Sequence, residues 1–270
     1  MTAHAITADT VAATVARLRE RRPRVHCITN SAAVNFTANV LLSAGCIPSM
    51  TVNPEEVPDF VAGADALLVN LGTLDPLRQD AIAAAIEVAA ETGKPWVLDP
   101  VFVERSRIRL ALAKRLAMAE PAAIRLNRAE LTALMGGEGN DDTQDTAPDH
   151  IAPGGDESAA AYALATLSTV VRTGDVDFIT DGVRSLIVEG GHPTMALVTA
   201  AGCAATALLA GFLAVEPDAV VASAVCLAFV AAAAEQAGMR SYGPGTFSPA
   251  FIDALYWLPP EEIGASARIS

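Results

Sequence analysis

Short apolar runs that end in a polar residue alternate along the chain with longer segments in which apolar residues recur at helical spacing. The run RVHCITN at 24–30 is typical of a strand, and 33–45 is typical of a helix that stops at glycine. The same alternation predicts strands at 47–52, 66–72, 95–100 and 122–127, and helices at 9–21, 53–64, 76–93, 109–117 and 128–136. This order predicts the α/β class, with a mostly parallel central sheet and helices on both faces.

The second half of the chain has a different pattern. A segment at 136–156 is rich in Gly, Asp and Pro and predicts a mobile acidic loop. After it, the Asp181-Gly182 pair between alternating apolar residues predicts a hairpin. The further elements that we expect are strands at 168–174, 176–182 and 184–191, and helices at 157–168, 196–215, 219–234 and within 241–258. No repeat or linker divides the chain, so we expect a single domain over 1–270.

Two of these segments, 196–215 and 219–234, carry no charged residue and are close to the length of a membrane span. A helical membrane protein is therefore one alternative. Alanine is close to neutral for insertion into a bilayer, however, and the rest of the chain has the pattern of a soluble protein. We favour buried helices in a large core or a subunit contact.

Composition narrows the choice of partners. The chain has 270 residues, 52% of them hydrophobic and only 5% aromatic, so the core must consist of Ala, Val, Leu and Ile. A formal net charge of −13 repels nucleic acids and anionic membrane surfaces, and we expect neither as a partner. A small anionic substrate would need local arginines, backbone N–H groups or a divalent cation.

The chain also lacks several common sites. Neither of its lysines, Lys94 and Lys114, lies in a phosphate-binding loop of the form GxxxxGK[ST], which excludes that type of nucleotide site. The four cysteines are widely scattered and form no zinc pattern, so we interpret them as reduced thiols. The N-terminus has no continuous apolar segment before its arginines. These features predict a cytoplasmic protein.

Ligands of parallel sheets bind beyond the carboxyl ends of the strands, where this chain would bring Asn30, Met50, Asp99 and Asn127 to one rim. Asp99 before a proline is either a turn former or a group that orients a metal or a hydroxyl. Glu130 is either part of a capping box with Asn127 or a carboxylate that holds hydrated Mg²⁺. His26 within a strand is expected to be a hydrogen-bonded core histidine.

Cys203 follows Gly202 at the start of an apolar helix. A helix N-terminus attracts anions and makes a cysteine more acidic and more reactive. The alternative is that Cys203 is one more small apolar residue among alanines. Taken alone, the residue favours this alternative.

Several motifs, in their order and spacing, change that balance. They are VHCITNSAAVNFTANVLLSAGCIPSM, PEEV, LVNLGTL, VLDPV, AIRLNRAE, TGDVDFITDG, GHP, the Gly202-Cys203 pair and GPGTFSPAFIDALY. Together they cover most of the chain, which on their strength resembles the hydroxyethylthiazole kinases of the ribokinase-like superfamily. The resemblance implies ATP as cosubstrate, Mg²⁺ as cofactor, phosphorylation of the thiazole alcohol of thiamine synthesis, and a homotrimer with active sites between subunits.

The resemblance also implies roles for single residues. Asn30, Met50, Ala200 and Gly202 match substrate-binding positions, and Arg125 and Thr173 match positions that contact the nucleotide. Asp99 and Glu130 match the acidic residues near the phosphates and the metal. Cys203 matches the position of the catalytic base, which is an aspartate in most ribokinase-like kinases and a cysteine in this family.

The chain departs from the family in two places. Ala200-Ala201-Gly202-Cys203 stands where the family usually has Gly-Thr-Gly-Cys, and an alanine at position 200 disfavours a positive φ. FVERSRIR at 102–109 replaces a glycine-alanine stretch, and we expect one of its arginines to lie near the phosphates. A kinase for another small alcohol, a hydrate dehydratase of similar fold, and a thiazole- or nucleotide-binding protein with weakened catalysis are therefore the alternatives.

Overall fold

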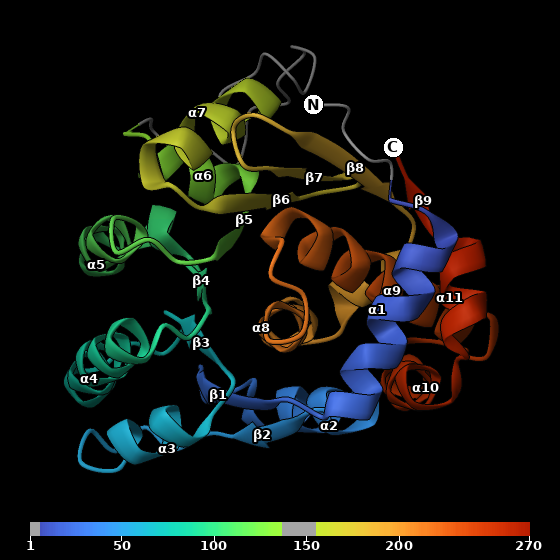
Figure 1. Cartoon of the computed structure of the whole chain (residues 1–270), viewed down its shortest axis with the longest axis horizontal. Helices are drawn as coiled ribbons and strands as arrows, with labels where there is room; N and C mark the ends of the chain where they lie inside the picture. The colour runs from blue at the N-terminus through green and yellow to red at the C-terminus, as the bar shows by residue number, and fades with distance from the viewer. Residues whose placement is uncertain (1–5, 137–154) are drawn as a thin grey trace.

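The computed structural model describes residues 6–136 and 155–270, whose strands all join one sheet (Figure 1). The strand order is β2-β1-β3-β4-β5-β6-β7-β8-β9. Neighbouring strands from β2 to β6 are parallel, whereas β6-β7, β7-β8 and β8-β9 are antiparallel. The mostly parallel sheet predicted from the sequence is confirmed. The single-domain expectation stays a prediction, which the continuous sheet favours.

The elements follow the predicted order. The strands are β1 (Arg24–Ile28), β2 (Ile47–Ser49), β3 (Ala66–Asn70), β4 (Trp96–Asp99), β5 (Ala123–Asn127), β6 (Thr169–Thr173), β7 (Asp177–Thr180), β8 (Ser185–Glu189) and β9 (Arg268–Ile269). The helices are α1 (Ala8–Arg21), α2 (Val34–Ala44), α3 (Val57–Gly63), α4 (Pro76–Thr92), α5 (Arg107–Ala117), α6 (Arg128–Leu134), α7 (Asp156–Thr166), α8 (Ala201–Leu213), α9 (Ala219–Met239), α10 (Pro244–Trp257) and α11 (Pro260–Ser266), with short 3₁₀ helices η1 (Val103–Arg105) and η2 (Pro193–Leu197).

Helices cover both faces of the sheet, as predicted (Figure 1). One core cluster joins α8 and α9 to α1, α2, α10 and α11, and α8 packs directly on β1, β3 and β4. A second core cluster joins the other face to α3, α4, α5, α6 and α7. The sheet therefore separates two cores, and α8 lies directly against the strands whose ends carry the expected site residues.

Capping residues set the ends of several helices. Thr7 caps α1, since its hydroxyl accepts the backbone N–H of Thr10 at 3.2 Å. Gly45 ends α2 with a φ of 104°, a conformation that favours glycine. The prediction for α3 is wrong at its start, because the carbonyl of Asn53 closes a turn with Glu56 and delays the helix to Val57. The last two elements, α11 and β9, were not predicted.

The two uncharged segments form α8 and α9. The first helix begins at Ala201 rather than at 196, because η2 and the left-handed backbone of Ala200 precede it. Of the described helices, α9 alone is long and apolar enough to span a membrane, but 67% of its most apolar window is buried inside the molecule. It packs against β7 and β8 as a core helix, which is the arrangement favoured from the sequence.

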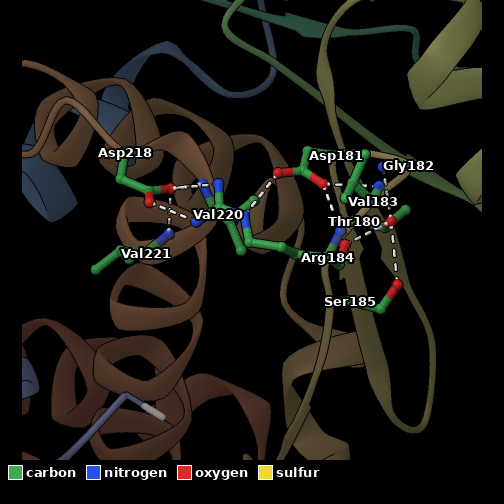
Figure 2. A network of polar contacts seen from close by, with 9 residues as sticks. All are labelled: Thr180, Asp181, Gly182, Val183, Arg184, Ser185, Asp218, Val220 and Val221. Carbon is green, nitrogen blue, oxygen red and sulfur yellow. Dashed lines mark hydrogen bonds and ion pairs between the residues drawn. The ribbon is translucent and has the colours of Figure 1, made fainter. Parts of the chain in front are cut away.

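An ionic network ties the β7-β8 hairpin to the start of α9 (Figure 2). The Arg184 guanidinium donates to Asp181 Oδ2 at 2.8 Å and to Asp218 Oδ2 at 2.6 Å. Asp218 is also the N-cap of α9, and its Oδ1 accepts the N–H of Val220 at 3.0 Å. The predicted hairpin at Asp181-Gly182 is confirmed. The expected acidic loop lies almost entirely outside the described residues.

Candidate active site

The carboxyl ends of β1, β3 and β4 meet the first turns of α8 in one hydrogen-bonded network. Asn30 Nδ2 donates to Cys203 Sγ at 3.3 Å and to Asn70 Oδ1 at 3.2 Å. Asn70 Nδ2 donates to Asp99 Oδ2 at 2.7 Å, and the Thr206 hydroxyl donates to the same oxygen at 2.9 Å. The thiol and the buried carboxylate are therefore linked through two amide side chains.

Asn70 and Thr206 are site residues that sequence reasoning missed. Asn70 is 1% exposed at the end of an otherwise apolar strand, and a polar residue in that position was the available signal. Gly72 makes room for the network, because a Cβ at this position would lie 2.6 Å from Asn30 Cβ. The Gly72 N–H also donates to Asn70 Oδ1 at 3.0 Å, which fixes the amide.

Two clefts meet at the N-terminus of α8. The first, of about 560 Å³, is lined by Cys203 together with Asn30, Ala200 and Gly202. The second, of about 590 Å³, contains Arg125 and Thr173. Gly202 and the neighbouring Ala201 line both. The structure thus brings together most of the predicted site residues around one helix terminus, with the thiol open to a cleft.

The acidity expected for Cys203 is not found. Burial, and then the nearby carboxylate of Asp99, raise the pKa of the thiol to about 11, while hydrogen bonds from Asn70 and Asn30 act in the opposite direction. The prediction that the helix terminus makes this cysteine more acidic is therefore wrong. The side chain is a neutral thiol at neutral pH, suited to orienting a hydroxyl group rather than to removing its proton outright.

Ala200 adopts the conformation that its side chain disfavours. Its φ is +71°, in the left-handed region, directly before the first turn of α8. This conformation costs a non-glycine residue about 1 kcal/mol. Position 200 therefore has a backbone conformation that favours glycine despite its alanine. The Ala201 N–H donates to the Val198 carbonyl at 3.2 Å, whereas the N–H groups of Gly202 and Cys203 have no backbone acceptor among the described residues.

Two carboxylates lie behind this helix terminus with unusually high pKa values. Burial raises the pKa of Asp99, although Arg125 and the hydrogen bond from Thr206 oppose the shift. Burial, and then the charge of Asp99, raise the pKa of Glu130 to about 7. No described lysine or arginine forms an ion pair with either carboxylate. Arg125 acts on Asp99 without an ion pair, so the negative charge of the two carboxylates is only partly balanced.

The capping box expected for Glu130 is present, and it does not exclude a metal role. Glu130 Oε2 accepts the N–H of Asn127 at 2.8 Å, and Oε1 accepts that of Phe102 at 3.1 Å. Asp99 uses only Oδ2 for its side-chain hydrogen bonds, so Oδ1 has no donor among the described residues. Two carboxylates with free lone pairs fit Mg²⁺, which takes few protein ligands and completes its shell with water and phosphate.

The second cleft contains the two residues expected at the nucleotide. Arg125 Nη1 donates to the Gly202 carbonyl at 3.1 Å and to the Thr206 hydroxyl at 3.3 Å, which holds the guanidinium beside α8. Thr173 ends β6 and donates to the Leu126 carbonyl at 3.3 Å. Both side chains belong to the strands β5 and β6, which pair in parallel, so neighbouring strand ends position them.

Other expectations have mixed outcomes. Met50 follows β2 and packs partly buried against the core, but it lines neither cleft, so its substrate role stays a prediction. His26 is a core histidine, as expected: its Nδ1 lies 2.8 Å from Ser49 Oγ, and burial lowers its pKa to about 4. Of the arginines at 102–109, Arg109 lines the cleft that contains Cys203.

Sequence comparisons agree with this geometry. The model of the hydroxyethylthiazole kinase family matches residues 15–261. The chain is 42% identical over 263 residues to a probable hydroxyethylthiazole kinase from Agrobacterium fabrum, covering 97% of this chain and 96% of that protein. It is 46% identical over 244 residues to a hydroxyethylthiazole kinase from Klebsiella pneumoniae, covering 88% and 92%.

Solved structures show the same relationship. A hydroxyethylthiazole kinase protein from Pyrococcus horikoshii superposes with a TM-score of 0.87 at 33% identity, over 97% of this chain and 98% of that one. A pyridoxal kinase from Staphylococcus aureus superposes with a TM-score of 0.59 at 16% identity, over 79% and 88%. The second likeness concerns the fold alone, which is that of the ribokinase-like kinases.

Proposed function

Because the chain belongs to the hydroxyethylthiazole kinase family, we propose that it transfers the γ-phosphoryl group of ATP to the hydroxyl of 4-methyl-5-(2-hydroxyethyl)thiazole. The observation that carries this proposal is the pair of clefts that meet at the first turn of α8. One cleft contains the thiol and the other contains Arg125 and Thr173. This arrangement suits a reaction in which a group passes from one ligand to another across a helix terminus.

Each cleft would bind one of the two substrates. ATP would lie in the cleft of Arg125 and Thr173, with its terminal phosphate at the N–H group of Gly202. The alcohol would lie in the cleft of Cys203, with Asn30 and Ala200 beside it. We propose Met50 as a further substrate contact, contributed at an edge of the sheet.

The reaction needs little acid or base strength from the protein. The alcohol oxygen forms a bond to the γ-phosphorus while the bond between that phosphorus and the bridging oxygen breaks, and its electron pair leaves with ADP. The transition state is loose, so the hydroxyl proton is lost late, to water, and a neutral thiol suffices to orient the hydroxyl. Cys203 acts by position, and the peptide dipoles of α8 stabilise the charge on the migrating group.

The acidic pair completes the site. Asp99 and Glu130 would hold hydrated Mg²⁺, because their negative charge is only partly balanced and Asp99 Oδ1 has no donor among the described residues. A cation held by these two carboxylates would supply positive charge beside the phosphate groups during transfer. The cation would also offset the long-range repulsion between ATP and a chain with a net charge of −13.

The assembly and location of the protein follow the same resemblance. We propose a cytoplasmic homotrimer of single-domain subunits with active sites between subunits. Analytical ultracentrifugation tests the trimer: a monomer that is fully active at assay concentration would contradict it.

The product assay tests the activity. Purified protein with Mg-ATP and the thiazole alcohol should form equal amounts of ADP and thiazole phosphate, whereas other small primary alcohols should react more slowly. Binding of both ligands without product would support a binding protein with weakened catalysis instead. The positive φ of Ala200 favours the active enzyme, because it keeps the backbone amides of α8 in place despite the missing glycine.

A further inference from the structure

We propose that Arg109 is the cation of the acceptor cleft, which binds the phosphoryl group as it arrives on the alcohol and then holds the phosphate ester formed. The proposal rests on the proposed function and adds a residue to it. Arg109 lies on α5, half-buried, and lines the same cleft as Cys203. The guanidinium therefore lies on the acceptor side of the helix terminus, whereas Arg125 lies on the nucleotide side.

The surroundings of Arg109 leave its charge unbalanced. Its Nη1 donates to the Val101 carbonyl at 3.1 Å, and no carboxylate of the described residues forms an ion pair with it. The contrast within the same segment is clear, since Arg105 pairs with Glu104 at 3.6 Å and Arg107 is exposed. A half-buried guanidinium without a carboxylate partner in an acidic protein is set to receive an anion from outside.

The segment that holds Arg109 is itself fixed to the acidic pair. The Phe102 N–H donates to Glu130 Oε1 at 3.1 Å, with Phe102 at a φ of +56° that is strained for a residue with a side chain. The next carbonyl before it, that of Val101, accepts from Arg109. Strain of this kind is maintained where the surrounding structure holds a functional position in place. Glu130 and Arg109 are thus positioned together on either side of one short segment.

The chemistry of the ligand explains why a cation is needed here. The alcohol is neutral and gains nothing from a guanidinium, whereas the phosphoryl group and the phosphate ester are anions. Arg109 therefore binds the transition state and the product more strongly than the substrate, which raises the rate of transfer without improving binding of the alcohol. The structure needs no base for this role, only a fixed charge-assisted hydrogen bond.

The test compares two ligands that differ by the phosphate group. Arg109→Gln should weaken binding of thiazole phosphate about tenfold or more, measured by calorimetry, because it loses a hydrogen bond to a charged group. Binding of the alcohol and of Mg-ATP should stay within about twofold, and kcat should fall without a rise in KM for the alcohol. Arg109→Lys should recover part of the loss. Arg107→Gln, an exposed neighbour on the same helix, is the matched control and should behave as wild type.

A second measurement uses the unmodified protein and does not depend on folding of a variant. Phenylglyoxal should modify Arg109 in the free enzyme, and thiazole phosphate or inorganic phosphate should protect it, whereas the alcohol should not; mass spectrometry locates the modified residue. Equal modification with and without phosphate, or equal loss of alcohol and ester affinity in Arg109→Gln, would overturn the proposal. If wild type forms no ester, the proposed function fails, while phosphate protection of Arg109 still decides the present inference.

Discussion

Two groups of carboxylates in this molecule have opposite surroundings. At the hairpin, burial opposes ionisation of Asp181 and Asp218, but hydrogen bonds from Arg184 and from the backbone lower the pKa of both (Figure 2). Behind α8, burial dominates, and the pKa values of Asp99 and Glu130 are raised. Arg184 forms ion pairs with both carboxylates of the first group, whereas in the second group Arg125 acts on Asp99 without an ion pair among the described residues.

The difference separates a structural tie from a site. Arg184 satisfies two carboxylates from elements far apart in the chain and so fixes the hairpin to α9. At Asp99 and Glu130 the cost of burial exceeds what Arg125 and the hydrogen-bond donors offset, because both pKa values remain raised. A cluster of raised carboxylate pKa values in a cleft is typical of a functional site, which agrees with the cation proposed for this pair.

The largest expected effect comes from removing the charge of Glu130, in the carboxylate pair behind α8. Glu130→Gln should lower kcat by about 10²- to 10³-fold, because charge neutralisation at the phosphates is lost. A glutamine oxygen can still accept the N–H of Asn127 at the start of α6, but its amide nitrogen cannot accept that of Phe102, so a modest fall in the melting temperature is expected. Steady-state assays with Mg-ATP and thermal unfolding measure the two. Unchanged turnover would remove the distinction between the two carboxylate groups.

A smaller loss of kcat is expected on substitution of Cys203, whose thiol is linked to Asp99 through Asn30 and Asn70. Cys203→Ala should lower kcat about tenfold through loss of positioning, with the Kd for ATP unchanged, because the nucleotide lies in the other cleft. Cys203→Ser should retain more activity, since a hydroxyl also accepts the hydrogen bond from Asn30. Full turnover by the alanine variant would rule out the role of the sulfur.

Substitutions in the hairpin network of Arg184 should lower the stability of the protein rather than its catalytic rate. Arg184→Ala should lower the free energy of unfolding by about 1 kcal/mol, a small value because the ion pairs are partly exposed and screened. Specific activity of the folded enzyme should remain unchanged. Asp218→Asn is a useful control, since asparagine still caps α9 but loses the charge. A large loss of kcat in Arg184→Ala would place the hairpin network in the active site.

The pH dependence of stability sharpens the comparison, because the two groups have opposite signs. Glu130 has a pKa of about 7 when folded and 4.5 ordinarily, so the metal-free protein should lose stability as pH rises between these values. Asp181 and Asp218 have lowered pKa values, so their contribution is present above the usual value of 3.8 and lost as pH falls through the folded pKa.

Urea unfolding across pH 3 to 8, on the order of one pH unit per step, measures both slopes. Glu130→Gln should flatten the curve on the neutral side, and Arg184→Ala should flatten it on the acid side. If both variants flatten the same range, the two groups are not electrostatically distinct.

Much of the architecture was predictable because it depends on local patterns. Apolar runs that end in Asn30, Asp99 and Asn127, followed by helical spacing and glycine stops, predicted the parallel strands and the rim where they end. The late starts of α3 and α8 escaped prediction, because a turn at Asn53 and a strained alanine at position 200 depend on backbone conformation rather than on hydrophobic spacing.

The sequence by itself determined the order of elements, the acidic field and the placement of a cysteine at the start of an apolar helix, because these depend on composition and on neighbours along the chain. Only the tertiary structure decided that Asn30 and Asn70 together join that cysteine to Asp99, that the thiol is neutral, and that Arg109 lines its cleft. Hydrogen bonding and burial between distant segments set these properties, since a side chain's charge state and reach depend on what the fold places around it.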